Sequence, residues 1–206
     1  MRRPRRPPLP SAAFNRVILE KAIVPAGARF GRIYEARHLD PIGFGKGPSR
    51  FSDPRRLVAR NRFGVLYLGS SLKVCFVEAI LRDDRDGAVG DHEIGNASLG
   101  RYRYAEIEVI DALTLVDLRA DGPIRKGIPS DVAGASAQSL ARAWSAACHD
   151  HPDAPDGIVY ASRLNEETNL AIYGRAVPKL KSVRVQPLVS ASGFADVLNT
   201  LRVALI

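Results

Sequence analysis

A single carboxylate, Glu78, lies in the middle of an apolar stretch that is predicted to form a helix, "LKVCFVEAILRD". Burying an unpaired carboxylate costs several kcal/mol, so its position needs an explanation. One explanation is a structural ion pair with Arg82, which follows at i+4. The other is a functional carboxylate, because Val74 and Leu81 share its helical face and direct it inward or into a cleft. The residues alone leave both explanations open.

Three other patterns resemble sites but fit the chemistry poorly. The glycine-rich stretch GFGKGPSR, residues 43–50, would let backbone approach a ligand, but it does not match a nucleotide phosphate loop. Residues 148–151, Cys-His-Asp-His, have no second cluster with which to converge on a metal, so we expect a solvated helix end and no metal. Ser70, Ser71 and Ser162 lack the G-x-S-x-G setting of a nucleophile, and nothing supports acyl transfer.

The formal charge of +8 suggests nucleic acid at first sight. Four of those charges belong to an N-terminal arm rich in proline, which contains Arg2, Arg3, Arg5 and Arg6. Removing those four charges from +8 leaves +4 for the rest of the chain, whose arginines are dispersed. We therefore expect no direct binding to nucleic acid.

The two cysteines, Cys75 and Cys148, lie far apart in apolar, helix-like stretches, which indicates reduced core thiols and a cytoplasmic location. No run of about 18 uncharged apolar residues is present, and the start MRRPRRPPLP lacks the apolar core of a secretory signal. We expect no association with a membrane.

The pattern of short strands with few helices predicts an α+β domain around a mostly antiparallel or mixed sheet, not a doubly wound one. A short helix is expected within residues 14–27, ending before Pro25, and a long loop over residues 40–62. Helices are also expected over 136–150 and 193–206. The expected strands are 29–38, 63–67, 101–110, 113–119, 156–165, 168–175 and 180–189.

The domain organisation follows from composition. Residues 1–13 are expected to be a disordered basic arm, because proline and arginine there cannot build a core. Residues 14–206 are expected to form a single domain, since no repeat and no second boundary is present.

Five residues in fixed order carry a resemblance to a known family. They are Arg32 in GRIYEA, Arg50 in PSRFSD, Tyr67 in VLYLGSS, Glu78 in CFVEAI and Ser162 in YASR, with Tyr67 and Glu78 eleven positions apart. This arrangement, over about residues 28–180, resembles the RES domain, the toxin component of RES/Xre-type toxin–antitoxin systems.

The resemblance implies a fold related to ADP-ribosyltransferases, with an NAD cleft between small sheets. It implies that Glu78 and Arg32 are catalytic, and that Arg32, Arg50, Tyr67 and Ser162 bind NAD, which is the substrate. The implied reaction breaks the bond between nicotinamide and ribose and passes ADP-ribose to water, phosphate or a protein target. The implied partner is an Xre-type antitoxin.

A catalytically inert relative that acts as a partner-binding or regulatory module is the alternative. This alternative is based on a difference from the family pattern. The basic segment SDPRRLVARNR at residues 52–62, between Arg50 and Tyr67, is longer than the connection common in the family. We expect this segment to be exposed beside the cleft, and two roles stay open: a contact with an acidic antitoxin or target surface, or a solvated loop with no role.

Overall fold

The computed structural model describes residues 7–56, 58–82, 84 and 89–206. The four arginines of the predicted N-terminal arm lie outside the described residues, as does Leu57 of the 52–62 segment. Within the described part of the arm, the carbonyl of Pro8 accepts a hydrogen bond from Trp144 Nε1 at 3.1 Å. The predicted boundary between arm and domain at residue 14 stays a prediction.

The strands of the described chain are β1 (Lys21–Val24), β2 (Arg29–Glu35), β3 (Val65–Gly69), β4 (His92–Ile94), β5 (Tyr102–Val109), β6 (Leu113–Asp117), β7 (Gly157–Ala161), β8 (Thr168–Tyr173), β9 (Leu180–Pro187) and β10 (Val203–Leu205). The α-helices are α1 (Leu72–Phe76), α2 (Asn96–Leu99), α3 (Gly122–Lys126), α4 (Asp131–Gly134), α5 (Ser139–His149) and α6 (Phe194–Leu201). A π-helix, Val77–Leu81, continues α1, and the 3₁₀ segments are Ala12–Arg16, Ala59–Asn61, Gly174–Lys179 and Leu188–Ser190.

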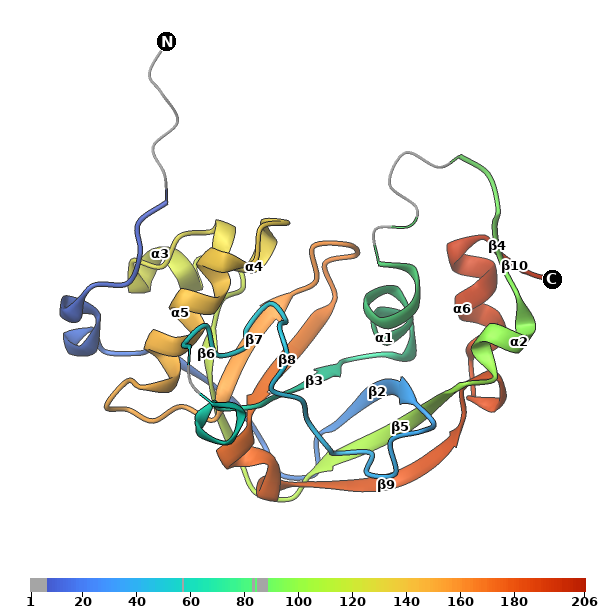
Figure 1. Cartoon of the computed structure of the whole chain (residues 1–206), viewed down its shortest axis with the longest axis horizontal. Helices are drawn as coiled ribbons and strands as arrows, with labels where there is room; N and C mark the ends of the chain where they lie inside the picture. The colour runs from blue at the N-terminus through green and yellow to red at the C-terminus, as the bar shows by residue number, and fades with distance from the viewer. Residues whose placement is uncertain (1–6, 57, 83, 85–88) are drawn as a thin grey trace, which may run out of the picture.

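Eight strands form one curled sheet in the order β1-β6-β7-β8-β3-β2-β5-β9 (Figure 1). Neighbours pair antiparallel except β6 and β7, which are parallel and are connected through α3, α4 and α5. Between β2 and β3 the register contains one pair, Gly31 with Gly69, whereas β2 pairs with β5 along its whole length. The sheet is therefore nearly divided between β3 and β2, and the two parts diverge beyond that pair.

Both faces of the central strands are buried, which explains why β7 and β8 are apolar at almost every position. On one face, Trp144 of α5 packs in a cluster with Ile158 and Tyr173. On the other, Val159 and Ile172 pack with Leu115. A third cluster joins α1, the π-helix and α6, where Phe76 meets Phe194 with ring centroids 6.0 Å apart, and it fixes the helix that carries Glu78.

The predicted α+β class with a mostly antiparallel, mixed sheet is confirmed. The sheets are larger than expected, because the two parts share the Gly31–Gly69 pair and make one sheet, and β4 and β10 add a separate parallel pair. The helix expected within residues 14–27 is wrong. A 3₁₀ segment ends at Arg16, and Lys21–Val24 pair with β6 as the edge strand β1, so tertiary pairing overrides local preference. The helix expected over 193–206 ends at Leu201, and the last residues form β10.

Both cysteines are free and buried, as predicted for core thiols. Burial raises the pKa of the Cys75 thiol and of the Cys148 thiol to about 12 each, so both stay protonated at neutral pH. Within the described residues, none of the helices has the length and apolar character needed to span a bilayer.

Candidate active site

A cleft of about 820 Å³ opens where β2 and β3 diverge, a volume that suits a ligand of nucleotide size. Arg32 on β2, Tyr67 on β3, Glu78 on the π-helix and Arg50 on the preceding long loop all line it. Ser162, just after β7, is hydrogen bonded to Glu78. The structure therefore brings together all five residues that the sequence singled out.

The carboxylate of Glu78 is held through one of its two oxygens. Ser162 Oγ donates to Oε1 at 2.7 Å, and Asn169 Nδ2 donates to the same atom at 3.0 Å. Within the described part of the chain, Oε2 accepts no hydrogen bond. Because the two donors are neutral, they fix the rotamer without neutralising the charge, and Oε2 is left for a ligand in the cleft.

The helix around Glu78 departs from regular α-geometry. Arg82 N donates to the carbonyl of Val77 at 2.7 Å, the i→i+5 bond of a π-turn, and such turns are frequent at functional sites. Arg82 then has φ of +46°, which ends the helix. Among the described residues no ion pair joins Arg82 to Glu78, so the structural-pair explanation for this carboxylate is wrong.

The start of the same helix is anchored beside β8. Ser71 Oγ accepts from Val74 N at 3.1 Å, an N-cap of the kind that contributes about 1 kcal/mol. Ser71 also donates to Glu167, whose other oxygen pairs with Lys73 Nζ at 2.6 Å. A Cβ on Gly69 would lie 2.6 Å from Val74 Cγ1, so a glycine is needed where the strand approaches the helix. The position of Glu78 relative to the sheet is therefore firmly set.

Two arginines line the cleft, and each donates to a backbone carbonyl. Arg32 donates to Pro41 O at 2.7 Å, and its guanidinium lies 5.5 Å from the ring centroid of Tyr34. Arg50 donates to Ala135 O at 2.7 Å. Burial lowers the pKa of Arg32 from its usual value, which shows that its charge is partly desolvated. Carbonyl partners orient both forks but leave their charges uncompensated.

The hydroxyl of Tyr67 organises the loop that carries Arg50. It accepts from Phe51 N at 2.8 Å and shares a 2.9 Å hydrogen bond with Ser49 Oγ. Burial raises the pKa of Tyr67, so the phenol stays protonated. Arg142 Nε adds a bond to Ser49 O at 2.9 Å. With its hydroxyl used inside the protein, Tyr67 can offer only its ring to a ligand.

The glycine-rich stretch also contributes to the cleft, although it is not a nucleotide phosphate loop. Gly45 and Gly47 line the cleft, and Gly45 forms an isolated bridge with Val65 of β3. Phe44 fixes the stretch, because its ring occupies the space where a Cβ on Gly64 or Gly174 would lie. The sequence indicated that backbone could approach a ligand at this stretch, and two of its glycines do line the cleft.

Comparison with known proteins agrees with this architecture. Residues 25–196 match the family model of the RES domain. The chain belongs to the RES domain family. A relative named "Probable toxin y4kH", from Sinorhizobium fredii, is 42% identical over 109 residues, which are 53% of this chain and 86% of that protein. One chain of the crystal structure of the M. tuberculosis MbcT-MbcA toxin-antitoxin complex shares the fold, with a TM-score of 0.60 and 20% identity over 87% of this chain and 91% of that chain.

Two cleft residues of this RES domain were missed or undervalued at the level of sequence. Asn169 is absent from the predicted site residues, yet it holds Glu78. Tyr160 was not considered, although it lines the cleft. In the β7–β8 register the two residues face each other, and Asn169 also faces Gly69 of β3. An asparagine within the apolar run TNLAIY was the signal available in the sequence.

The basic 52–62 segment of the RES domain is only partly as predicted. Arg56 and Arg60 are exposed, as expected. Asp53 is buried, and Arg55 donates to both of its carboxylate oxygens and also pairs with Asp150 at 2.9 Å. Of the described residues in this segment, none lines the cleft. The start of the segment is thus part of the packed domain.

Residues 148–151 have structural roles in the RES domain. Cys148 is buried, and the ring of His149 stacks on Phe63 with centroids 4.2 Å apart. His149 Nδ1 is 2.7 Å from Asp150 Oδ1. No group of three or more His, Cys, Asp or Glu side chains suited to a metal occurs among the described residues.

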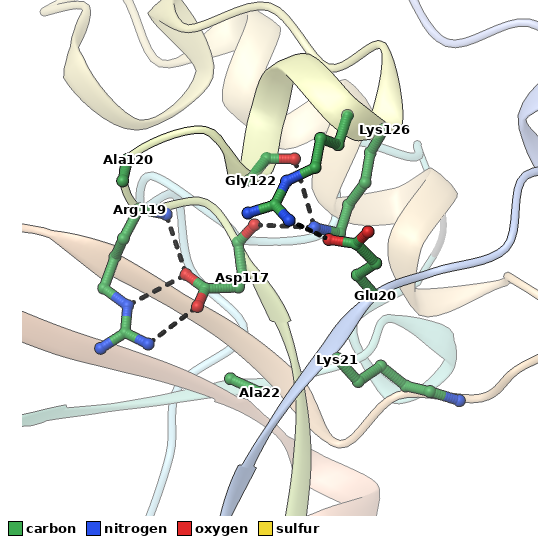
Figure 2. Close-up of a pocket in the computed structure, with 9 residues that line it drawn as sticks. Glu20, Lys21, Ala22, Asp117, Arg119, Ala120, Gly122 and Lys126 are labelled. Carbon is green, nitrogen blue, oxygen red and sulfur yellow. Dashed lines mark hydrogen bonds and ion pairs between the residues drawn. The ribbon is translucent and has the colours of Figure 1, made fainter.

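A second pocket, of about 470 Å³, lies beside β1 and the end of β6 (Figure 2). Its charged groups compensate one another. Arg119 donates to both carboxylate oxygens of Asp117, and Arg125 pairs with Glu20 at 3.1 Å. The buried Lys126 donates to two backbone carbonyls, one of them that of Asp117, at 3.2 Å each. We therefore place the functional site in the larger cleft.

Proposed function

We propose that this RES-domain protein is a toxin of a toxin–antitoxin pair and that it cleaves the bond between nicotinamide and ribose in NAD. The observation that carries the proposal is the carboxylate of Glu78, held at one oxygen by Ser162 and Asn169 and open at the other toward a cleft with two arginines. Two relatives support the toxin role, since one is named a probable toxin and the other belongs to a toxin–antitoxin complex.

Glu78 supplies the catalytic charge in this proposal. As nicotinamide leaves with the bonding electron pair, it becomes neutral, and positive charge develops on the ribose. No acid is needed, because the leaving group is cationic at the start. Oε2 of Glu78 accepts a hydrogen bond from a ribose hydroxyl and stabilises the developing charge, an effect worth several kcal/mol when water is excluded.

Arg32 and Arg50 bind the pyrophosphate. Each has one N–H on a backbone carbonyl, at Pro41 and Ala135, and the remaining N–H groups of each fork are suited to phosphate oxygens. Arg32, on β2, also offsets the negative charge of the phosphate next to the reacting sugar, which is its catalytic role. The ring of Tyr67 stacks on nicotinamide, and its hydroxyl keeps the Arg50 loop in place.

The acceptor is water, inorganic phosphate or a side chain of a protein target. In each case the acceptor oxygen or nitrogen forms a bond to the anomeric carbon and releases its proton. An antitoxin of the Xre type is the proposed partner, and the proposed location is the cytoplasm, where NAD is available.

The test is to incubate the purified protein with NAD and measure free nicotinamide, with and without phosphate and cell lysate. Mass spectrometry of the second product separates ADP-ribose, phosphorylated ADP-ribose and a modified protein. Nicotinamide release by the wild type is expected. Its absence under all conditions removes the enzymatic proposal and leaves the inert, partner-binding alternative.

A further inference from the structure

Tyr160 is a buried residue that the proposed mechanism does not use. It belongs to β7, has 5% exposure, and packs its ring on Phe51 with centroids 4.9 Å apart in an edge-on arrangement. It also lines the large cleft. The ring is thus fixed by the core while one edge of the residue borders the ligand space.

The hydroxyl of Tyr160 has no hydrogen-bond partner within the described part of the chain. Buried phenols in proteins usually find a partner, as Tyr173 does through Ser145 O at 2.9 Å. Among the described residues, the side-chain polar atoms that are both fully buried and without a partner are His151 Nε2 and Asn165 Nδ2. The phenol oxygen is not among them, so it is not fully enclosed, and the residue lines the cleft.

The surroundings of this hydroxyl define its place in the cleft. Three titratable groups act electrostatically on the phenol, those of Tyr67, Glu78 and Arg50, and all three line the cleft. In the sheet register Tyr160 faces Asn169, which holds Glu78. Tyr160 therefore lines the same cleft as the carboxylate assigned to the ribose and the arginine assigned to the pyrophosphate.

We propose that the hydroxyl of Tyr160 donates a hydrogen bond to the phosphate that is attached to the nicotinamide ribose of NAD. This inference rests on the proposed function and adds a binding residue to it. In NAD, that phosphate joins the reacting sugar to the rest of the pyrophosphate, so it falls between the groups bound by Glu78 and Arg50. Burial raises the pKa of Tyr160 well above its ordinary value, so the phenol keeps its proton and donates.

The test replaces Tyr160 by phenylalanine, which keeps the ring on Phe51 and removes only the hydroxyl. Binding is measured by calorimetry in a Glu78→Gln background, so that NAD is not consumed, and wild-type turnover is measured separately. Because a hydrogen bond to an anionic oxygen is lost, we expect NAD to bind about tenfold more weakly. Nicotinamide mononucleotide, which has the phosphate, should lose a similar factor, and nicotinamide riboside, which lacks it, should lose none.

Tyr173→Phe is the matched control, because Tyr173 is a buried tyrosine of the same core cluster that does not line the cleft. It loses the bond to Ser145 O, so its melting temperature should fall by roughly a few degrees while NAD affinity is unchanged. Tyr160→Phe should show the opposite pattern, with melting temperature unchanged and affinity reduced.

The outcomes separate this inference from the proposed function. If the wild type releases nicotinamide and Tyr160→Phe binds NAD as tightly as its parent, the role of Tyr160 is overturned and the function stands. If the riboside loses as much affinity as the mononucleotide, the contact is to the ribose and the assignment to the phosphate is overturned. If the Glu78→Gln parent binds no NAD and the wild type releases no nicotinamide, both proposals fail.

Discussion

The large cleft and the second pocket are both lined by arginines and carboxylates, yet they treat these charges differently. In the second pocket each carboxylate faces an arginine, as in the pair of Asp117 and Arg119. In the cleft, Glu78 is held by a serine and an amide, and Arg50 by a backbone carbonyl. In the second pocket (Figure 2) both carboxylates are paired with arginines and Lys126 donates to backbone carbonyls, whereas among the described residues neither Glu78 nor the cleft arginines Arg32 and Arg50 form an ion pair.

This difference shows that the number of charged residues does not identify a functional site. The two sites differ in the kind of group that is hydrogen bonded to, or paired with, each carboxylate. A neutral donor or a backbone carbonyl orients a charged group and leaves its charge available to a ligand. An opposite charge neutralises the group, which then binds a ligand less strongly. Tyr160 also lines the cleft, and its hydroxyl has no hydrogen-bond partner among the described residues, so it is available to a ligand.

The largest expected effect is that of Glu78→Gln. Glutamine keeps the volume and accepts from Ser162 and Asn169, but it has no charge to stabilise the ribose in the transition state. We expect turnover of NAD to fall by about 10²–10³-fold, with NAD affinity within a few-fold of the wild type. Nicotinamide release and calorimetry measure the two quantities. Near-normal turnover would reduce Glu78 to a structural residue.

Replacing either pyrophosphate arginine should act on binding. Arg32→Ala and Arg50→Ala are each expected to weaken NAD binding by about 10–100-fold, because both contact phosphates in the ground state. Lysine should restore part of the affinity, since it keeps the charge but cannot make the fork. Unchanged affinity by calorimetry in both alanine variants would place the pyrophosphate elsewhere.

A smaller effect is expected at Asn169. Asn169→Leu keeps most of the volume and removes the donor to Glu78 Oε1, while Ser162 remains. A less firmly held carboxylate should lower kcat by about tenfold and leave KM nearly unchanged, since Asn169 acts through Glu78. Steady-state kinetics gives the split between kcat and KM. An effect on KM alone would mean that Asn169 binds the substrate directly.

The smallest effect on activity is expected in the second pocket. Arg119→Ala should leave NAD cleavage unchanged and cost at most about 1 kcal/mol of stability, as exposed ion pairs do. Burial raises the pKa of Asp117, but its hydrogen bonds to Arg119 outweigh this and lower the pKa overall. The stabilisation is therefore present above the unfolded carboxyl pKa, about 3.9, and is lost as the pH falls through the lower folded value.

Thermal unfolding at several pH values tests this sign. The wild type should exceed Arg119→Ala in melting temperature at neutral pH, and the difference should shrink below about pH 4. A loss of NAD cleavage in Arg119→Ala would contradict the division of roles between the two pockets.

The central strands were predictable because a strand that is buried on both faces has a nearly continuous apolar sequence, as β7 and β8 do. Glu78 was predictable as a candidate because a lone carboxylate in an apolar helix is costly. The edge strand β1 was missed, since its pairing with β6 depends on residues 89 to 95 positions away, Lys21 with Val116 for example. Local sequence contains no information on that contact.

The hydrogen-bond partners of the Glu78 carboxylate could not be predicted from the sequence. The helix that carries Glu78 packs with α6 in one cluster and ends in a π-turn at Val77–Leu81, and the pair with Arg82, one of the two explanations that the sequence left open, does not form. The register that places Asn169 beside Tyr160 and opposite Gly69 is likewise a property of the assembled sheet. The residues of a candidate site can be predicted from a sequence, but the hydrogen bonds among their side chains depend on the folded structure.

The most direct test of the central claim is a crystal structure of Glu78→Gln with NAD. The account predicts NAD in the cleft between β2 and β3, with pyrophosphate oxygens within hydrogen-bond distance of Arg32 and Arg50 and the nicotinamide ribose against residue 78. NAD bound in the second pocket, or an empty cleft at saturating NAD while the wild type releases nicotinamide, would contradict it.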